Sequence, residues 1–153
     1  MKKINYFHIL LSILFASCES NYSKSKNSLN VTTIEQKIEN LKNSNNNQVI
    51  VVSHRGDWRN APENSLQAIK NCIDMGVDMV EIDIRETKDG HLVVMHDKTL
   101  DRTTNAKGKV KEWTLDSLRT LYLKDGLGVV TKHKIPTLKE ALEVSKNKIL
   151  VNL

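Results

Sequence analysis

Four short apolar runs lie between residues 49 and 153, with polar or helix-like segments between them, and this order constrains the fold more than any other feature. The runs expected to form strands are residues 49–52, 79–84, 92–95 and 149–153. The first, Val-Ile-Val-Val, is an unbroken β-branched run, which is typical of a strand buried on both faces of a parallel sheet. Strands interleaved with helices predict an α/β fold with a parallel sheet.

Two segments between these runs carry helix-start signals. Asn64 is expected to be the N-cap of a helix in which the side chain of Gln67 reaches back to the cap. Thr137 and Glu140 have the spacing of a capping box, which opens another helix just before the last apolar run. Cys72 lies on the apolar face of the first of these helices, so we expect its side chain to belong to the core.

The link between the second and third runs interrupts the strand–helix alternation. Residues 85–91 are too few to form a helical crossover between parallel strands. The link is therefore either an extended return to the bottom of the sheet or the turn of a hairpin, and the residues alone leave both alternatives open.

Residues 1–18 have the pattern of a secretory signal peptide, with Lys2 and Lys3 followed by a mostly apolar stretch over residues 4–16. That stretch is too short to span a bilayer as a permanent helix. The following Cys18 ends a Phe-Ala-Ser-Cys sequence that resembles a bacterial lipoprotein box, in which the cysteine is lipidated. We therefore expect an extracytoplasmic, membrane-anchored lipoprotein, in the periplasm or on the cell surface. The alternative is an ordinary cleaved signal, or a short anchor, that leaves Cys18 unmodified.

The rest of the chain divides into a polar tether and a globular domain. Residues 19–47 are expected to form the tether, with a short helix at residues 33–41, and residues 48–153 the domain. The formal net charge is +5, but two of the lysines belong to the leader, and basic and acidic residues are interleaved in the remainder. No basic stripe is present, so the charge pattern argues against a nucleic-acid partner.

Alternation in the second run places two carboxylates on one face. Val80, Ile82 and Ile84 share the face expected to pack on helices, while Glu81 and Asp83 share the other. Two neighbouring carboxylates are suitable ligands for a hard cation such as Mg²⁺ or Ca²⁺. The alternative is that both simply form the solvent face of an edge strand.

Two histidines follow strands. His54 comes after the first run and His96 after the third, so in a parallel (β/α) barrel both would lie with the carboxylates at the active-site edge. Two histidines can divide general-base and general-acid work near neutral pH, and Arg55 offers a planar fork for phosphate oxygens. Together these groups favour cleavage of a phosphate ester. The alternative is that each histidine is a hydrogen-bonded structural residue.

Six ordered motifs carry a resemblance to a known family. They are His54-Arg55-Gly56, Pro62-Glu63-Asn64-Ser65, Glu81-Ile82-Asp83, Thr87-Lys88-Asp89-Gly90, Val94-Met95-His96-Asp97 and Leu100-Asp101-Arg102-Thr103-Thr104. In this order and spacing they resemble the N-terminal half of a glycerophosphodiester phosphodiesterase, over about residues 49–153.

The resemblance implies a TIM-type (β/α) barrel of the phosphodiesterase kind, of which only the first half is present in this chain. It implies that His54 and His96 are the acid/base pair, that Glu81 and Asp83 hold a divalent cation, Mg²⁺ or Ca²⁺, and that Arg55 contacts the phosphate. It also favours the extended-return alternative for the link between the second and third strands. The implied reaction is hydrolysis of a glycerophosphodiester, a small-molecule substrate, to an alcohol and glycerol 3-phosphate.

The family supplies a third acidic metal ligand beyond the position of Leu153. We therefore expect the 153-residue chain to be an incomplete and inactive fragment. The competing hypothesis is a lipid-anchored protein that binds phosphodiester head groups without hydrolysing them.

Overall fold

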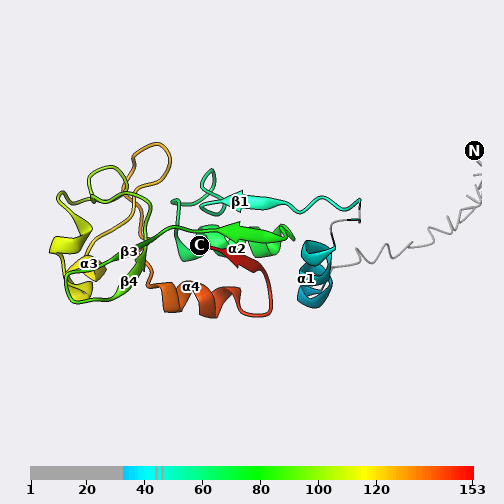
Figure 1. Ribbon diagram of the computed structural model, residues 1–153. Coiled ribbons are helices and arrows are strands. Elements are labelled where there is room, and N and C mark those ends of the chain that lie inside the picture. The colour runs from blue at the N-terminus through cyan, green and yellow to red at the C-terminus, as the bar shows by residue number, and fades with distance from the viewer. Residues whose placement is uncertain (1–32, 44, 46) are drawn as a thin grey trace, which may run out of the picture.

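The computed structural model describes residues 33–43, 45 and 47–153, so the predicted signal peptide and Cys18 lie outside the described residues. The elements are α1 (Ile34–Lys42), β1 (Val52–His54), α2 (Leu66–Asp74), β2 (Met79–Glu81), β3 (Ile84–Glu86), β4 (Leu92–Val94), the 3₁₀ helix η1 (Val110–Glu112), α3 (Leu115–Thr120), α4 (Leu138–Ser145) and β5 (Leu150–Asn152). Figure 1 shows α1 at one end of the molecule and α3 with strands β3 and β4 at the other.

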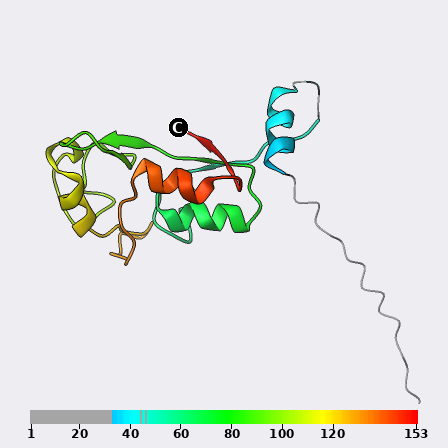
Figure 2. The same cartoon turned by 90° about the horizontal axis from the view of Figure 1, so that it is seen from below.

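A parallel sheet of order β1-β2-β5 forms the centre of the α/β fold. Helices α2 and α4 lie side by side against one face of this sheet (Figure 2). The register places His54, Glu81 and Asn152 beside one another at the carboxyl ends of the three strands. Parallel pairing is therefore confirmed for the first, second and fourth apolar runs, whereas the third run, as β4, lies in a separate two-stranded sheet.

The predicted alternation is confirmed for residues 80–83, but the second apolar run is divided between β2 and β3, and Ile84 at the start of β3 is only partly buried. Val80 and Ile82 are fully buried against α2, α4 and Ile149, while Glu81 and Asp83 point to the other face and stay partly exposed. Burying each aliphatic side chain contributes roughly 1.5–3 kcal/mol, so this face fixes the orientation of both carboxylates. Cys72 is also fully buried in this cluster, as expected.

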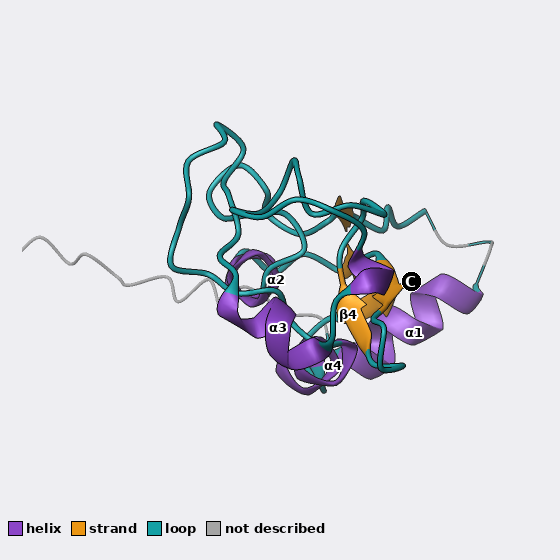
Figure 3. Cartoon of the chain, turned by 90° about the vertical axis from the view of Figure 1, so that its left-hand side faces the viewer, coloured by secondary structure: helices purple, strands orange, loops and turns teal. Residues whose placement is uncertain are grey.

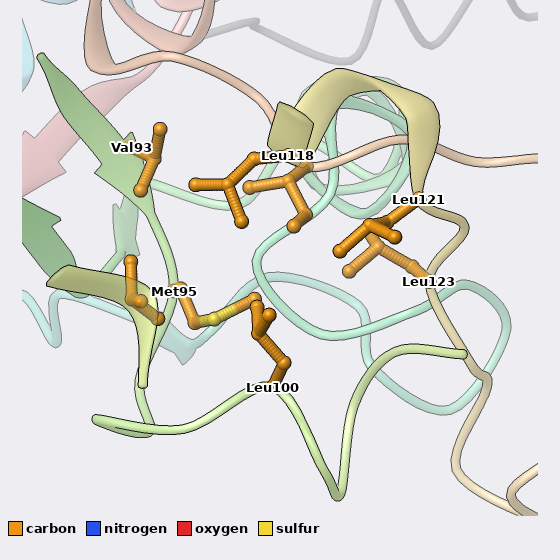
Figure 4. Packing of buried hydrophobic residues seen from close by; sticks show 8 residues of the cluster. Val93, Met95, Leu100, Leu118, Leu121 and Leu123 are labelled. Carbon is orange, nitrogen blue, oxygen red and sulfur yellow. The ribbon is translucent and has the colours of Figure 1, made fainter. Parts of the chain in front are cut away.

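A second core lies beneath the loops around α3, and these loops make up much of the end of the molecule seen in Figure 3. Its buried side chains come from β4, α3 and the connecting segments, and they converge as Figure 4 shows. They are Val93, Met95, Leu100, Val110, Leu118, Leu121, Leu123 and Ile135. This core supports the segment that follows β4, which carries His96.

Strands β3 and β4 form an antiparallel hairpin, so the extended return favoured by the resemblance is wrong. The reason is local turn chemistry. The Thr87 hydroxyl donates to Asp89 and accepts from the backbone N–H of His91, and Gly90 supplies a positive φ of 80°. The chain consequently turns back on itself and does not cross to the bottom of the sheet.

Two local predictions also need correction. The run at residues 49–52 is not buried on both faces, because β1 starts only at Val52 and pairs with β2 alone among the described strands, which leaves Val49 and Val51 exposed. The N-cap of α2 is Ser65, whose side chain accepts from the N–H of Ala68, and not Asn64. The side chain of Asn64 is used at the site described below.

The short helix expected in the tether is present as α1. Thr33 and Gln36 form a capping box at its start. The buried Lys37 ammonium donates to the carbonyl of Val77 and lies 3.4 Å from Asp78, which ties α1 to the turn before β2. In the part of the chain that the structure describes, none of the helices is long and apolar enough to cross a membrane.

Candidate active site

The adjacent carboxyl ends of β1 and β2 bring the first predicted site residues together. His54 Nε2 lies 4.0 Å from Glu81 Oε2, and the same oxygen accepts a 2.9 Å hydrogen bond from the backbone N–H of Arg55. The contact follows from the register, since His54 and Glu81 are direct partners on neighbouring strands. The imidazole remains accessible, with 67% of its surface exposed.

The chain leaves β1 through an unusual turn. Arg55 has a φ of 57° and Gly56 a φ of 76°, both in the left-handed region. A Cβ on Gly56 would lie 2.8 Å from the Cβ of Ala68 in α2, so the turn packs too closely on the helix for any side chain there. Left-handed backbone at a non-glycine residue is costly and is characteristic of functional sites, and here it aims Arg55 across the end of β2.

Asn64 holds the second carboxylate. It is 3% exposed and has a φ of 58°. Its side-chain carbonyl accepts from the backbone N–H of Asp83, and its amide donates to Asp83 Oδ2 at 3.0 Å. The same Oδ2 lies 3.5 Å from Nε of Arg55, a buried nitrogen that has no hydrogen-bond partner in the described chain. Asp83 is thus fixed in position by an amide and a guanidinium.

The two carboxylates match the oxygen preference of Mg²⁺ and Ca²⁺. Each is partly exposed, and one oxygen of each, Oε1 of Glu81 and Oδ1 of Asp83, accepts no hydrogen bond within the described residues. Across residues 33–43, 45 and 47–153, however, no cluster of three or more His, Cys, Asp or Glu side chains is placed to hold a metal ion. The pair fits as part of a cation site that needs further oxygen ligands.

The hairpin explains how His96 reaches this edge of the sheet. The chain passes Glu81 and Asp83, continues outward as β3, and returns as β4, so that the N–H of Met95 donates to the carbonyl of Asp83 at 2.9 Å. His96 follows directly. The chain thus returns beside Asp83 just before His96, through an antiparallel hairpin and not through a third parallel strand.

Asp97 contacts the ring of His96. Its Oδ1 lies 2.6 Å from His96 Nδ1, and both of its oxygens accept from Arg102, at 2.8 and 2.9 Å. The hydrogen bonds from Arg102, and after them the contact with His96, hold the pKa of Asp97 well below its usual range in spite of partial burial. Asp97 is therefore an ionised acceptor.

Glu63 connects Arg102, which binds Asp97, to Arg55. It accepts from Arg102 at 2.6 and 2.8 Å and from Nη1 of Arg55 at 3.2 Å. Burial alone would raise the pKa of Glu63, but the hydrogen bonds and positive charges of Arg102 and Arg55 outweigh it and lower that pKa. A continuous series of contacts, a hydrogen bond from His96 to Asp97 followed by ion pairs through Arg102 and Glu63, therefore reaches Arg55.

Arg85 supports the other side of His96. One of its terminal nitrogens donates to the backbone carbonyl of His96, and another donates to the carbonyl of Ile84 at 3.2 Å. Arg85 lies on β3, so the hairpin itself carries this contact. Together with Asp97 it restrains both the backbone and the ring of His96.

The structure thus places all five predicted site residues at one edge of the fold, in two groups. In the first group, His54 contacts Glu81, Glu81 accepts from the backbone N–H of Arg55, and Arg55 lies beside Asp83. His96 forms the second group and is linked to the first through Asp97, Arg102 and Glu63. Within the described chain His96 makes no direct bond to His54. The side chains that the sequence reasoning missed are Glu63, Asn64, Arg85, Asp97 and Arg102. Four of these five lie inside the motifs quoted above, and that placement was the available signal.

Comparisons with known proteins agree on one family. Residues 54–153 match the Glycerophosphoryl diester phosphodiesterase family. A glycerophosphodiester phosphodiesterase of Caldanaerobacter subterraneus is 44% identical over 108 residues, which cover 69% of this chain and 44% of that protein. Glycerophosphodiester phosphodiesterase 1 of Homo sapiens is 39% identical over 101 residues, covering 62% of this chain and 30% of the human protein.

Solved structures give the same result. A glycerophosphoryl diester phosphodiesterase from Parabacteroides distasonis matches with a TM-score of 0.70 and 34% identity, covering 77% of this chain and 42% of that one. A phosphodiesterase of Oleispira antarctica, solved in complex with the product sn-glycerol-3-phosphate, matches with a TM-score of 0.61 and 34% identity over 69% of this chain and 43% of that one. The chain therefore spans less than half the length of each of these relatives.

Proposed function

The chain belongs to the glycerophosphoryl diester phosphodiesterase family, and we propose that residues 54–153 contribute the active site of an enzyme that hydrolyses glycerophosphodiesters to an alcohol and glycerol 3-phosphate. The observation that carries this proposal is the placement of His54, Arg55, Glu81, Asp83 and His96 at one edge of the fold. The product bound to the related Oleispira antarctica enzyme supports the choice of substrate class. We further propose that the domain is a TIM-type (β/α) barrel.

Each residue has a role that follows from its chemistry. Arg55 donates to the phosphate oxygens, because its guanidinium is always charged and presents a planar set of N–H groups. Glu81 and Asp83 would hold the divalent cation through the two oxygens that accept no hydrogen bond. When bound, that cation supplies positive charge that offsets the negative charge developing around phosphorus.

His54 and His96 move the protons. One imidazole accepts the proton of the attacking oxygen, from water or from the glycerol hydroxyl of the substrate, as a new bond to phosphorus forms. The other donates a proton to the oxygen of the leaving alcohol as its bond to phosphorus breaks. If the glycerol hydroxyl attacks first, a second round with water opens the cyclic phosphate and gives glycerol 3-phosphate.

We also propose that the protein is an extracytoplasmic lipoprotein, anchored to a bacterial membrane through Cys18 in the periplasm or on the cell surface. The support is the leader pattern of residues 1–18 alone. Mass spectrometry of the mature N-terminus tests it: an acylated Cys18 supports the proposal, and an N-terminus at another residue, or a free Cys18 thiol, contradicts it.

The experiment for the enzymatic proposal measures release of glycerol 3-phosphate from glycerophosphocholine and glycerophosphoethanolamine. The whole protein is assayed with Mg²⁺, with Ca²⁺ and after removal of cations by a chelator. We expect cation-dependent turnover that falls about 10²-fold or more in His54→Ala and in His96→Ala, the typical contribution of general acid–base catalysis.

The matched control is His91→Ala, which removes an exposed histidine that lies 3.8 Å from Asp89 and outside the site. It should keep wild-type turnover. Substrate binding without any hydrolysis in the wild-type protein would refute the enzymatic proposal and favour the head-group-binding alternative.

A further inference from the structure

The contact between His96 and Asp97 determines which ring nitrogen carries the proton. Asp97 is an ionised carboxylate that already accepts two hydrogen bonds from Arg102, so it can only accept from the ring. The short 2.6 Å contact is therefore a hydrogen bond donated by Nδ1–H of His96. A neutral imidazole protonated on Nδ1 has its free electron pair on Nε2.

Arg102 is the centre of a double bidentate contact. Its Nε and Nη2 donate to Asp97, and its Nη1 and Nη2 donate to Glu63. Four hydrogen bonds of 2.6–2.9 Å thus use the rigid fork of one guanidinium. A lysine has a single nitrogen at the end of a flexible stem and cannot reproduce this geometry.

Glu63 extends the arrangement to the phosphate-binding arginine. Its Oε1 accepts from both Arg102 and Nη1 of Arg55. Only 17% of the Glu63 side chain is exposed, so the contact is shielded from water to a large degree. The orientation of Arg55 is consequently coupled to the same guanidinium that holds Asp97.

We propose that Asp97 and Arg102 are positioning residues that hold His96 as the Nδ1–H tautomer, with Nε2 free to exchange the catalytic proton, and that Arg102 aligns this ring with Arg55 through Glu63. The proposal rests on the proposed function for its catalytic part. The tautomer of His96 is a property of the protein without substrate, so it is measurable whether or not hydrolysis is found.

A purely structural role for these ion pairs would give a different result. Half of the Arg102 side chain is exposed, and solvent screening limits what its ion pairs add to stability. Loss of stability therefore cannot identify a positioning role. A positioning role is identified by the tautomer of the His96 ring and by whether a substitution changes kcat or KM.

The first arm of the test is ¹⁵N NMR of the imidazole nitrogens of His96 in the full chain, at a pH where the ring is neutral. The wild-type ring should be protonated on Nδ1. Asp97→Ala should shift it toward the Nε2–H tautomer that free histidine favours in water. Asp97→Asn should retain the Nδ1–H tautomer, because an amide carbonyl also accepts a hydrogen bond.

The second arm measures kcat and KM for hydrolysis by the whole protein and its variants. Asp97→Ala should lower kcat about 10- to 100-fold, as substitutions of orienting partners commonly do, with KM changed less than about threefold. Asp97→Asn should recover part of kcat. Arg102→Lys should lower kcat and also raise KM, because Arg55 loses the alignment provided through Glu63.

The matched control is Arg119→Lys. Arg119 makes a bidentate pair with Glu140 of the same kind, at 2.6 and 3.2 Å, away from the site. The control should change neither the tautomer nor the kinetics.

A wild-type ring protonated on Nε2, or an Asp97→Ala ring that keeps the wild-type tautomer, overturns the proposal. A shifted tautomer with unchanged kcat overturns the positioning role. Absence of hydrolysis in the wild-type protein contradicts the proposed function alone, since the NMR arm needs no substrate.

Discussion

Gly56 controls how the site is attached to the scaffold. It combines a φ of 76° with a close approach to α2, in which an added Cβ would lie 2.8 Å from Ala68 Cβ and 3.0 Å from the Ala68 carbonyl carbon. Both restrictions act on the same residue, directly after the histidine and arginine of the proposed site. Replacing it must either strain the turn or move α2 away from β1.

We predict that Gly56→Ala destabilises the fold by roughly 1–3 kcal/mol more than Gly76→Ala, the typical cost of forcing extra volume into a packed site. Gly76 is the matched control because its φ of 73° is nearly the same but an added Cβ would have nothing within 4 Å. Denaturant unfolding of both variants measures the difference. Equal losses of stability in the two variants would contradict the prediction, because they would mean that the fold accommodates a Cβ at position 56 beside Ala68 without cost.

Single residues differ in how far the sequence predicts their role. The orientation of Glu81 and Asp83 follows from the two-residue period of a strand, which is a local property. The role of Arg102 is not local, since its partner Glu63 lies 39 positions away and only the folded chain brings them together. Asn64 was predicted as a helix cap, and instead its amide serves Asp83 while Ser65 takes the cap.

Helix α4 combines a local feature that the sequence predicts with a long-range contact that it does not. Its start was predicted from the capping box, and the structure confirms that Thr137 and Glu140 cap each other's backbone. What the sequence did not show is that Arg119 of α3 also binds Glu140. Hydrogen bonds from Arg119 and, after them, from Thr137 lower the pKa of Glu140 from 4.5 to about 2.

This shift predicts a specific pH dependence of stability. Because the folded pKa of Glu140 is lower than the unfolded one, its contribution is complete above about pH 4.5 and is lost as the pH falls from there toward 2. Glu140→Gln should therefore flatten the dependence of the unfolding midpoint on pH in this window. The control is Glu143→Gln, since the Glu143 carboxylate lies 4.0 Å from Lys139 and outside the helix cap. Identical pH profiles for wild type and Glu140→Gln would contradict the prediction.

The β3–β4 hairpin is the element on which the sequence interpretation was least successful. Seven residues between two apolar runs are compatible with either an extended return or a turn, so length alone could not decide. The decisive contacts are the Thr87 hydrogen bonds to Asp89 and His91 within the turn. The hairpin brings the backbone of Met95, the residue before His96, to Asp83 by a path that differs from the one the resemblance implied.

At the scale of the whole molecule, the parallel sheet, its covering helices and the edge that carries the site were predictable from the pattern of strands and helices. The chain spans 44% of the related Caldanaerobacter protein and 42% of the Parabacteroides structure. In the proposed active site both histidines, Arg55 and the two carboxylates come from this chain, at the edge of its parallel sheet.

A crystal structure of the protein with Ca²⁺ and glycerol 3-phosphate would test the proposed active site directly. We expect the cation to contact the free oxygens of Glu81 and Asp83, and the phosphate to contact Arg55 between the imidazoles of His54 and His96. A cation bound away from both carboxylates, or a phosphate out of reach of Arg55 and both histidines, would contradict this expectation.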